Sequence, residues 1–547
     1  MIIFLKLAII CLTLKRGKTM RTILILFAFI TATQAQQCEP VKLNQDLPSD
    51  ADVSFYDIIP DGNSRIAFLA NVQDPAFFDL YTVSYLGGAT PELFDPGFIE
   101  GGAVNGLPQF NPSGSIAVYV ADANTLGVDE LYSISTASGV QTPVKLNDTM
   151  TSGGDVQEFQ ISPDGMYVVY VADQDVNGIK ELYSVSIAGG NVVQLSSPSI
   201  QANGLMDGFK ISDNSNHVLY MAADNGGFIT QLYAVEITGG TVNTLNDNLI
   251  ANGLVANFTL SHNGTHVYYR ATQENTSMLE LYRTKIDGST SANKVNDVLV
   301  NSGNVFEFSE SPNASRVVYL ADQNILGEKA LFSVPSAGGN SVELNDTLVA
   351  GGDILDFKIS ANGNTVVYQG DQDDAMFVEL YSTPIIGGVS VKLNATLTAS
   401  GNVGSFFISP NNNRVIYLAD QNTDTQDELF SVAINGGVVI KLNGNLPSGA
   451  DVGDDYEFTP NGSTIIYRAD QNNQGVDEIF AVASAGGSNT RLNSDMVVGG
   501  DIIPFPSFRI TADGSRLIYF ADQDVNNKFE IYSTLISCDF IFSNGFE

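Results

Sequence analysis

The chain repeats one pattern of about fifty residues along most of its length, and this repeat restricts its fold more than any other feature. The clearest copy begins at Val156 and contains four short runs rich in β-branched and aromatic residues. Pro163-Asp164-Gly165 separates the first two runs, and Gly189-Gly190 separates the last two; both are turn-forming sequences. Four short antiparallel strands per repeat predict one blade of a β-propeller.

Two aromatic markers count the repeats independently. One lies in the second predicted strand and the other in the third, and each recurs every 49 to 52 residues, which gives ten repeats. The second-strand markers are Phe68, Tyr119, Tyr170, Tyr220, Tyr269, Tyr319, Tyr368, Tyr417, Tyr467 and Tyr519. The third-strand markers are Tyr81, Tyr132, Tyr183, Tyr233, Tyr282, Phe332, Tyr381, Phe430, Phe480 and Tyr532.

The last repeat contains only three predicted strands, and the beginning of the repeat region provides the missing one. Pro40-Val41-Lys42-Leu43-Asn44 matches the fourth-strand sequence Val391-Lys392-Leu393-Asn394. A blade shared by the two termini removes the exposed edges of an open ring. We therefore predict an all-β fold in which residues 38–538 form a single closed propeller of ten four-stranded blades.

Two cysteines, Cys38 and Cys538, flank this shared blade. Alignment on the repeat places Cys538 on Gly189 and Cys38 on Gly190, so a disulfide would replace the missing hairpin turn. Two cysteines in an exported protein indicate one bridge. The alternative is a pair of unrelated cysteines.

Residues 1–35 are predicted to be a leader. Met20-Arg21 precedes a short apolar run, and Thr33-Gln34-Ala35 provides small residues for cleavage, so Met20 is a candidate for the true start. No apolar run reaches the roughly 18 residues that span a bilayer. We expect export to the periplasm, the cell surface or the medium. Residues 539–547 form a short tail that is either a processing or sorting signal or a strand or disordered end packed on the tenth blade.

The charge balance restricts the partners. The chain has 61 acidic and 25 basic residues and a formal net charge of −36. Such a charge repels nucleic acid and anionic membranes and attracts cationic partners.

The turn Ser162-Pro163-Asp164-Gly165, followed by an apolar strand with an aromatic residue, resembles the TolB-like, WD-type propeller repeats of bacteria. Variants of the turn recur through the chain, as at Pro60-Asp61-Gly62 and Pro460-Asn461-Gly462. The resemblance covers residues 38–538 and implies a propeller fold and a tendency to bind proteins. It names no particular partner.

Catalytic motifs are scarce. The sequence has no Gly-x-Ser-x-Gly elbow, and its only histidines, His217, His262 and His266, fall in turns and at strand starts. We therefore expect a protein that is not an enzyme. The alternative is a lyase or glycosidase that uses paired carboxylates.

The loops between the second and third strands offer a possible metal site. Three of them carry oxygen-bearing side chains at alternate positions and end in Glu, the ligand type and spacing that Ca²⁺ prefers. The alternative is that Asp and Asn are ordinary turn residues here, and we commit to no cofactor. The candidate ligands are Asp173, Asp175, Asn177 and Glu181; Asp420, Asn422, Asp424 and Glu428; and Asp522, Asp524, Asn526 and Glu530.

The loops that enter the blades are acidic as well, as at Asp155, Asp353 and Asp501. In a propeller they open on the same face as the loops between the second and third strands, so this face should carry negative potential. The sequence thus predicts an exported, monomeric, non-enzymatic scaffold that binds a protein or other cationic ligand through its acidic loop face. A calcium-dependent structural protein of the cell surface is the second interpretation.

Overall fold

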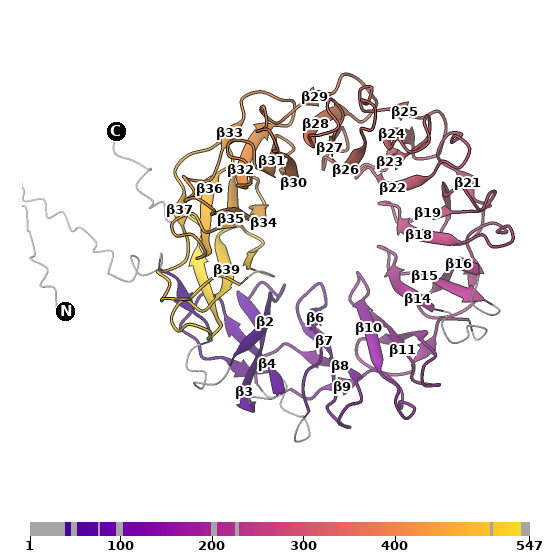
Figure 1. Ribbon diagram of the computed structural model, residues 1–547. Coiled ribbons are helices and arrows are strands. Elements are labelled where there is room, and N and C mark those ends of the chain that lie inside the picture. The colour runs from indigo at the N-terminus through magenta and orange to yellow at the C-terminus, as the bar shows by residue number, and fades with distance from the viewer. Residues whose placement is uncertain are drawn as a thin grey trace, which may run out of the picture.

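The computed structural model describes residues 39–44, 52–74, 77–94, 102–139, 141–197, 205–224, 229–503 and 507–537. They form ten four-stranded antiparallel sheets arranged around a ring (Figure 1). The predicted single ten-bladed β-propeller is confirmed. Within these ranges no helix occurs that could cross a membrane. The leader, Cys38, Cys538 and residues 539–547 lie outside the described residues.

The first strand of each blade lies at the inner side of the ring, and the second packs beside it. The first strands are β2 (Val53–Ile58), β6 (Gln109–Phe110), β10 (Val156–Ile161), β14 (Leu205–Ile211), β18 (Val255–Leu260), β22 (Val305–Glu310), β26 (Ile354–Ile359), β30 (Val403–Ile408), β34 (Val452–Phe458) and β38 (Phe508–Ile510). The second strands are β3 (Arg65–Asp74), β7 (Ile116–Ala121), β11 (Tyr167–Ala172), β15 (His217–Asp224), β19 (His266–Ala271), β23 (Arg316–Ala321), β27 (Thr365–Gly370), β31 (Arg414–Ala419), β35 (Thr464–Ala469) and β39 (Arg516–Ala521).

The third and fourth strands form the outer half of each blade. The third strands are β4 (Phe77–Ser84), β8 (Glu130–Ser135), β12 (Glu181–Ser186), β16 (Ile229–Glu236), β20 (Glu280–Lys285), β24 (Ala330–Pro335), β28 (Glu379–Pro384), β32 (Glu428–Ala433), β36 (Glu478–Ala483) and β40 (Glu530–Leu535). The fourth strands are β5 (Glu92–Leu93), β9 (Val144–Lys145), β13 (Val193–Gln194), β17 (Asn243–Thr244), β21 (Asn293–Lys294), β25 (Val342–Glu343), β29 (Val391–Lys392), β33 (Ile440–Lys441), β37 (Thr490–Arg491) and β1 (Val41–Lys42).

The two aromatic markers of each repeat are cross-strand partners. Tyr170 on β11 pairs with Tyr183 on β12, and their rings stack with centroids 5.3 Å apart. The same stack occurs in all ten blades, at 5.3 to 5.8 Å. A buried phenol needs a hydrogen-bond partner, and the Tyr170 hydroxyl donates to Gln174 at 3.0 Å. The stack therefore fixes a polar residue at the start of the following loop.

The hydrophobic core lies between neighbouring blades rather than within one. Val118 and Val120 of β7, for example, belong to the same buried cluster as Phe159 and Val168 of the next blade. Each blade thus depends on contact with both neighbours.

The fourth strand is short in eight blades because an asparagine ends it, and Ser196 takes this role in blade three. In blade seven Leu393 donates its N–H to the Leu380 carbonyl at 2.7 Å, and the Asn394 side chain then accepts the Leu380 N–H at 2.9 Å. The side-chain oxygen takes the place of the next backbone acceptor, so pairing stops there.

The N-terminal strand closes the ring as predicted. Val41 pairs with Ser533 and Lys42 with Tyr532, which makes β1 the fourth strand of the last blade. Leu43 donates to the Ile531 carbonyl at 2.8 Å, and the Asn44 side chain accepts the Ile531 N–H at 2.8 Å. The closure therefore repeats the strand ending found in blade seven.

This equivalence gives a test of closure. Asn44→Ala and Asn394→Ala each leave one buried backbone N–H without its acceptor, at a cost of about 1–3 kcal/mol. We expect similar losses of unfolding free energy from the two variants, measured by denaturant unfolding. A loss from Asn394→Ala without one from Asn44→Ala would show that the ring is open at the shared blade in solution.

Candidate functional site: the acidic loop face and an inner-wall cavity

The first aspartate of each predicted calcium loop is a structural acceptor. Asp173 is buried; one carboxylate oxygen accepts the Asp155 N–H and the other accepts the Gly178 N–H, both at 2.7 Å. Asp420 and Asp522 repeat this arrangement with the N–H groups of Asn402 and Thr425, and of Asp501 and Asn527. These carboxylates hold the loop against the loop that enters the same blade.

The glutamates at the ends of these loops bond to the outer strands. Glu181 accepts from the Tyr183 hydroxyl and from Gln194, both at 2.7 Å. Glu428 forms an ion pair with Lys441 on β33. Glu530 does so with Lys42 on β1 and also accepts from the Tyr532 hydroxyl.

The remaining candidate ligands lie at the loop tips. Asp175 accepts from the Tyr183 hydroxyl at 3.1 Å, Asn177 donates to the Ser152 carbonyl at 3.2 Å, and Asp524 lies 4.0 Å from the Lys42 ammonium. No group of three or more His, Cys, Asp or Glu among the described residues could hold a metal ion. The calcium interpretation has no support in this geometry and stays a prediction. The other three candidate ligands, Asn422, Asp424 and Asn526, are exposed.

A second set of side chains, which we call the rim, joins neighbouring blades. The Asp501 side chain accepts the Asp477 N–H at 2.7 Å, while its own N–H bonds to Asp522. Asn402 makes the same two bonds, with Val378 and Asp420. A carboxylate and an amide are therefore interchangeable here as acceptors. The rim consists of Asp155, Asn304, Asp353, Asn402, Asp451 and Asp501.

The carboxylates around the rim crowd one another. Desolvation raises the pKa of Asp427 to about 6, and the charges of Asp451, Asp420 and Asp454 add to this effect. Burial likewise raises the pKa of Asp501 to about 6, with a contribution from the Asp477 carboxylate. Burial is thus the larger cause of both pKa shifts, and the neighbouring carboxylates add to it.

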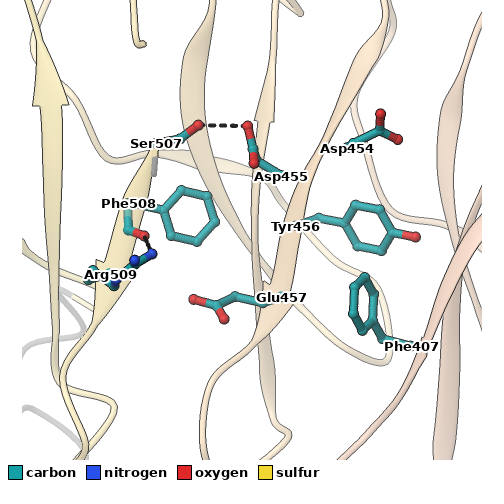
Figure 2. A pocket seen from close by; sticks show the side chains of 8 residues that line it. All are labelled: Phe407, Asp454, Asp455, Tyr456, Glu457, Ser507, Phe508 and Arg509. Atoms are coloured by element: carbon teal, nitrogen blue, oxygen red, sulfur yellow. Dashed lines mark hydrogen bonds between the residues drawn. The ribbon is translucent and has the colours of Figure 1, made fainter. Parts of the chain in front are cut away.

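A cavity of about 480 Å³ lies on the inner wall beside this rim, where β30, β34 and β38 adjoin (Figure 2). Asp454 lines the cavity, and its charge contributes to the raised pKa of Asp427 beside the rim. Sequence reasoning does not identify the cavity, although the acidic pair at the start of β34 was a visible departure from the repeat. The lining residues are Phe407, Asp454, Asp455, Tyr456, Glu457, Ser507, Phe508 and Arg509.

Part of the cavity wall is already neutralised. Asp455 accepts from the Ser507 hydroxyl at 2.7 Å and from Arg468 at 3.0 Å. Arg509 lies 3.8 Å from Asp57 of the first blade. The Asp454 and Glu457 carboxylates form no ion pair or hydrogen bond with any other side chain that the structure describes.

These features define the class: the chain is a ten-bladed β-propeller with backbone-bonded acidic loops on one face. No protein-family model matches it, and no curated protein matches its sequence. A putative TolB from Agrobacterium tumefaciens is similar over 46% of this chain and 83% of that chain, with 18% identity and a TM-score of 0.27. Dipeptidyl peptidase 4 of Porphyromonas gingivalis is similar over 76% of this chain and 64% of that chain, with 11% identity and a TM-score of 0.45.

A prolyl endopeptidase structure is similar over 67% of this chain, with 12% identity and a TM-score of 0.36, and the chain spans 54% of its length. The structural neighbours therefore include a TolB protein and peptidases. At such identities the similarity concerns the fold, and no activity transfers from it.

The bonding of Asp173 predicts a stability loss that does not depend on calcium. Asp173→Ala leaves two backbone N–H groups unpaired, and we expect about 1–3 kcal/mol less unfolding free energy, both in chelator and in millimolar calcium. Asp175→Ala, at an exposed position of the same loop, should cost less than about 1 kcal/mol. A calcium-dependent rise in melting temperature that Asp173→Ala abolishes would instead establish the calcium site.

The pKa of Asp501 predicts a pH dependence with a definite sign. Its folded value of about 6 lies above the value of about 3.9 for an unfolded aspartate, so the folded state binds more protons between these values. Its contribution to stability is present below about pH 4 and is lost as the pH rises through about 6. Asp501→Asn keeps the acceptor, so the variant should gain stability relative to the parent across this window in thermal melts. A constant difference would contradict the assignment.

Proposed function

We propose that the protein is a non-enzymatic binding scaffold that receives a cationic protein partner on its acidic loop face. The observation that carries the proposal is the crowding of carboxylates there, with the pKa of Asp427 and of Asp501 raised to about 6. A cationic partner relieves this repulsion on binding, so part of the unfavourable energy of the free face becomes binding energy.

The construction of the loops suits a preformed binding surface. Asp173, Asp420 and Asp522 fix the loops by bonds to backbone N–H groups. A face that is ordered before binding loses little conformational entropy when the partner arrives. The rim extends over six blades, a breadth that suits a protein better than a single small cation.

The location of the partner follows from the leader. We propose that the scaffold is exported, on the basis of the charged and apolar pattern of residues 20–35. The partner would then belong to the envelope or the surroundings of the cell.

The amide residues of the rim define a test of the face. The fourfold variant Asp155→Asn, Asp353→Asn, Asp451→Asn and Asp501→Asn removes four charges and keeps the acceptors that Asn304 and Asn402 use. A lysine-rich peptide should bind the parent with an affinity that falls with salt, and the variant at least about tenfold more weakly, by isothermal titration calorimetry.

A control removes the same charge from the opposite face, where the turns between strands one and two and between strands three and four lie. It combines Asp164→Asn, Asp213→Asn, Asp287→Asn and Asp513→Asn. We expect the control to retain most of the affinity. An equal loss in both variants would mean that net charge alone attracts the peptide, and would overturn the proposal.

A further inference from the structure

The interface between blades five and six departs from the repeat at three positions. The first of them is the end of the first strand, which is an apolar residue in nine blades but Glu310 in β22 of blade six. Glu310 is only 2% exposed, and a buried carboxylate is costly unless hydrogen bonds and a nearby charge compensate it. The nine apolar residues are Ile58, Phe110, Ile161, Ile211, Leu260, Ile359, Ile408, Phe458 and Ile510.

The second departure provides one of the hydrogen-bond donors. Tyr268 of β19, in blade five, is fully buried and donates its hydroxyl to Glu310 Oε1 at 2.7 Å. The corresponding residue, just before the second-strand aromatic, is aliphatic in the other nine blades and has no hydroxyl to donate. These counterparts are Ala67, Val118, Val169, Leu219, Val318, Val367, Ile416, Ile466 and Ile518.

The third departure is His262, in the turn between β18 and β19. Its N–H donates to Glu310 Oε2 at 2.7 Å, and its Nδ1 atom lies 3.4 Å from the same oxygen. Six other blades have proline at this position, which has no N–H to donate. These are Pro60, Pro112, Pro163, Pro312, Pro410 and Pro460. The three departures therefore meet in one contact, in which blade five supplies the donors and blade six the carboxylate.

The surroundings of Glu310 leave His262 as its direct basic partner. Among the described residues, His262 alone lies within ion-pair distance of Glu310. Arg283 is the cross-strand partner of Tyr268 and lies 5.7 Å from its ring centroid, but it forms no ion pair in this part of the chain. The turn of blade four, which contains Asp213, packs against the turn of His262 from the other side.

His266 is the second histidine near this contact, and its neighbours keep it neutral. Burial lowers the pKa of His266, and the charges of Arg283 and Lys285 lower it further. The carboxylates of Glu310 and Asp287 act in the opposite direction and offset only part of this shift. A proton taken up at this interface near neutral pH therefore goes to the other imidazole.

We propose that His262, Tyr268 and Glu310 form a pH-sensitive clasp between blades five and six. Proton uptake by His262 turns a neutral contact with Glu310 into an ion pair, and charge-assisted hydrogen bonds are about twice as strong as neutral ones. Imidazole is the side chain that changes charge between about pH 5 and 8. Because the folded ring offers the proton a buried carboxylate that the unfolded chain does not, the clasp tightens as the pH falls through this range and loosens as it rises.

The clasp lies halfway around the ring from the closure between blades ten and one (Figure 1). Five blades stand on each side of the line that joins the two contacts. Tyr268 also packs in the same buried cluster as Val317 and Leu331 of blade six, so a looser clasp weakens the core that the two halves share. The pH response should therefore appear as local opening of the ring at this interface.

Hydrogen exchange measured by mass spectrometry tests the clasp. In the parent, the protection of β19 and β22, corrected for the intrinsic exchange rate, should rise at least about threefold from about pH 7.5 to about pH 5.5, the scale expected for a half-exposed ion pair. His262→Gln keeps the backbone N–H bond but cannot take up the proton, so the rise should disappear. Glu310→Gln keeps the shape and removes the charge, and it should abolish the rise as well.

The matched control is His266→Gln, which removes a histidine of the same blade that stays neutral and should leave the response of the parent intact. The protection of β30, which ends in Ile408, should not change between the parent and His262→Gln at either pH. A rise in His262→Gln equal to that of the parent, or its loss in His266→Gln, would overturn the clasp. Melting curves identify variants that do not fold, and the His262 side chain, 48% exposed, carries the test if Glu310→Gln is one of them.

Discussion

The structure depends on the pairing of its two ends. Leu43 and Asn44 both form hydrogen bonds with Ile531 and complete the last blade. Asn44 and Ile531 are 487 residues apart in the sequence. Because the cores lie between blades, this contact also covers Ile518 and Phe520 against Val53 and Tyr56 of the first blade. In a closed ring no blade has a free face. The two-residue strand β1 therefore closes the ring, and this closure leaves every blade packed between two neighbours.

The large acidic excess serves two purposes that the sequence does not separate. Asp173 and its counterparts accept backbone N–H bonds, and Glu428 and its counterparts pair with lysines on the outer strands. These charges hold the loops and blades together. What remains for recognition is the smaller set at the rim. Burial raises the pKa of Asp501 in the rim, and it raises the pKa of Asp427 beside the rim, where the neighbouring carboxylates add to the effect.

The sequence predicts the fold well because the repeat is local. The Tyr170–Tyr183 stack, the turns and the asparagine that ends most fourth strands are short-range features, and the closing strand is visible as a displaced copy of a fourth strand. The site is harder to predict. Alternate oxygen-bearing residues in a loop suit calcium and backbone capping equally, and the spacing does not reveal where the lone pairs point. The cavity arises from Phe407, Glu457 and Arg509 of three different blades, so no single repeat contains its signature.

The interchange of Asp501 with Asn402 in the rim has a consequence for orientation. Both residues support the same backbone bonds, so the charge of a blade is set independently of its shape. The ring is nearly tenfold symmetric in its backbone, yet its charge pattern is not: blades six and eight carry amides where four other blades carry carboxylates. On a ring with ten identical blades, a partner could bind in ten equivalent orientations around the ring axis. Here the unequal charges make the orientations around the ring axis different in energy, so a charged partner can bind in one preferred orientation.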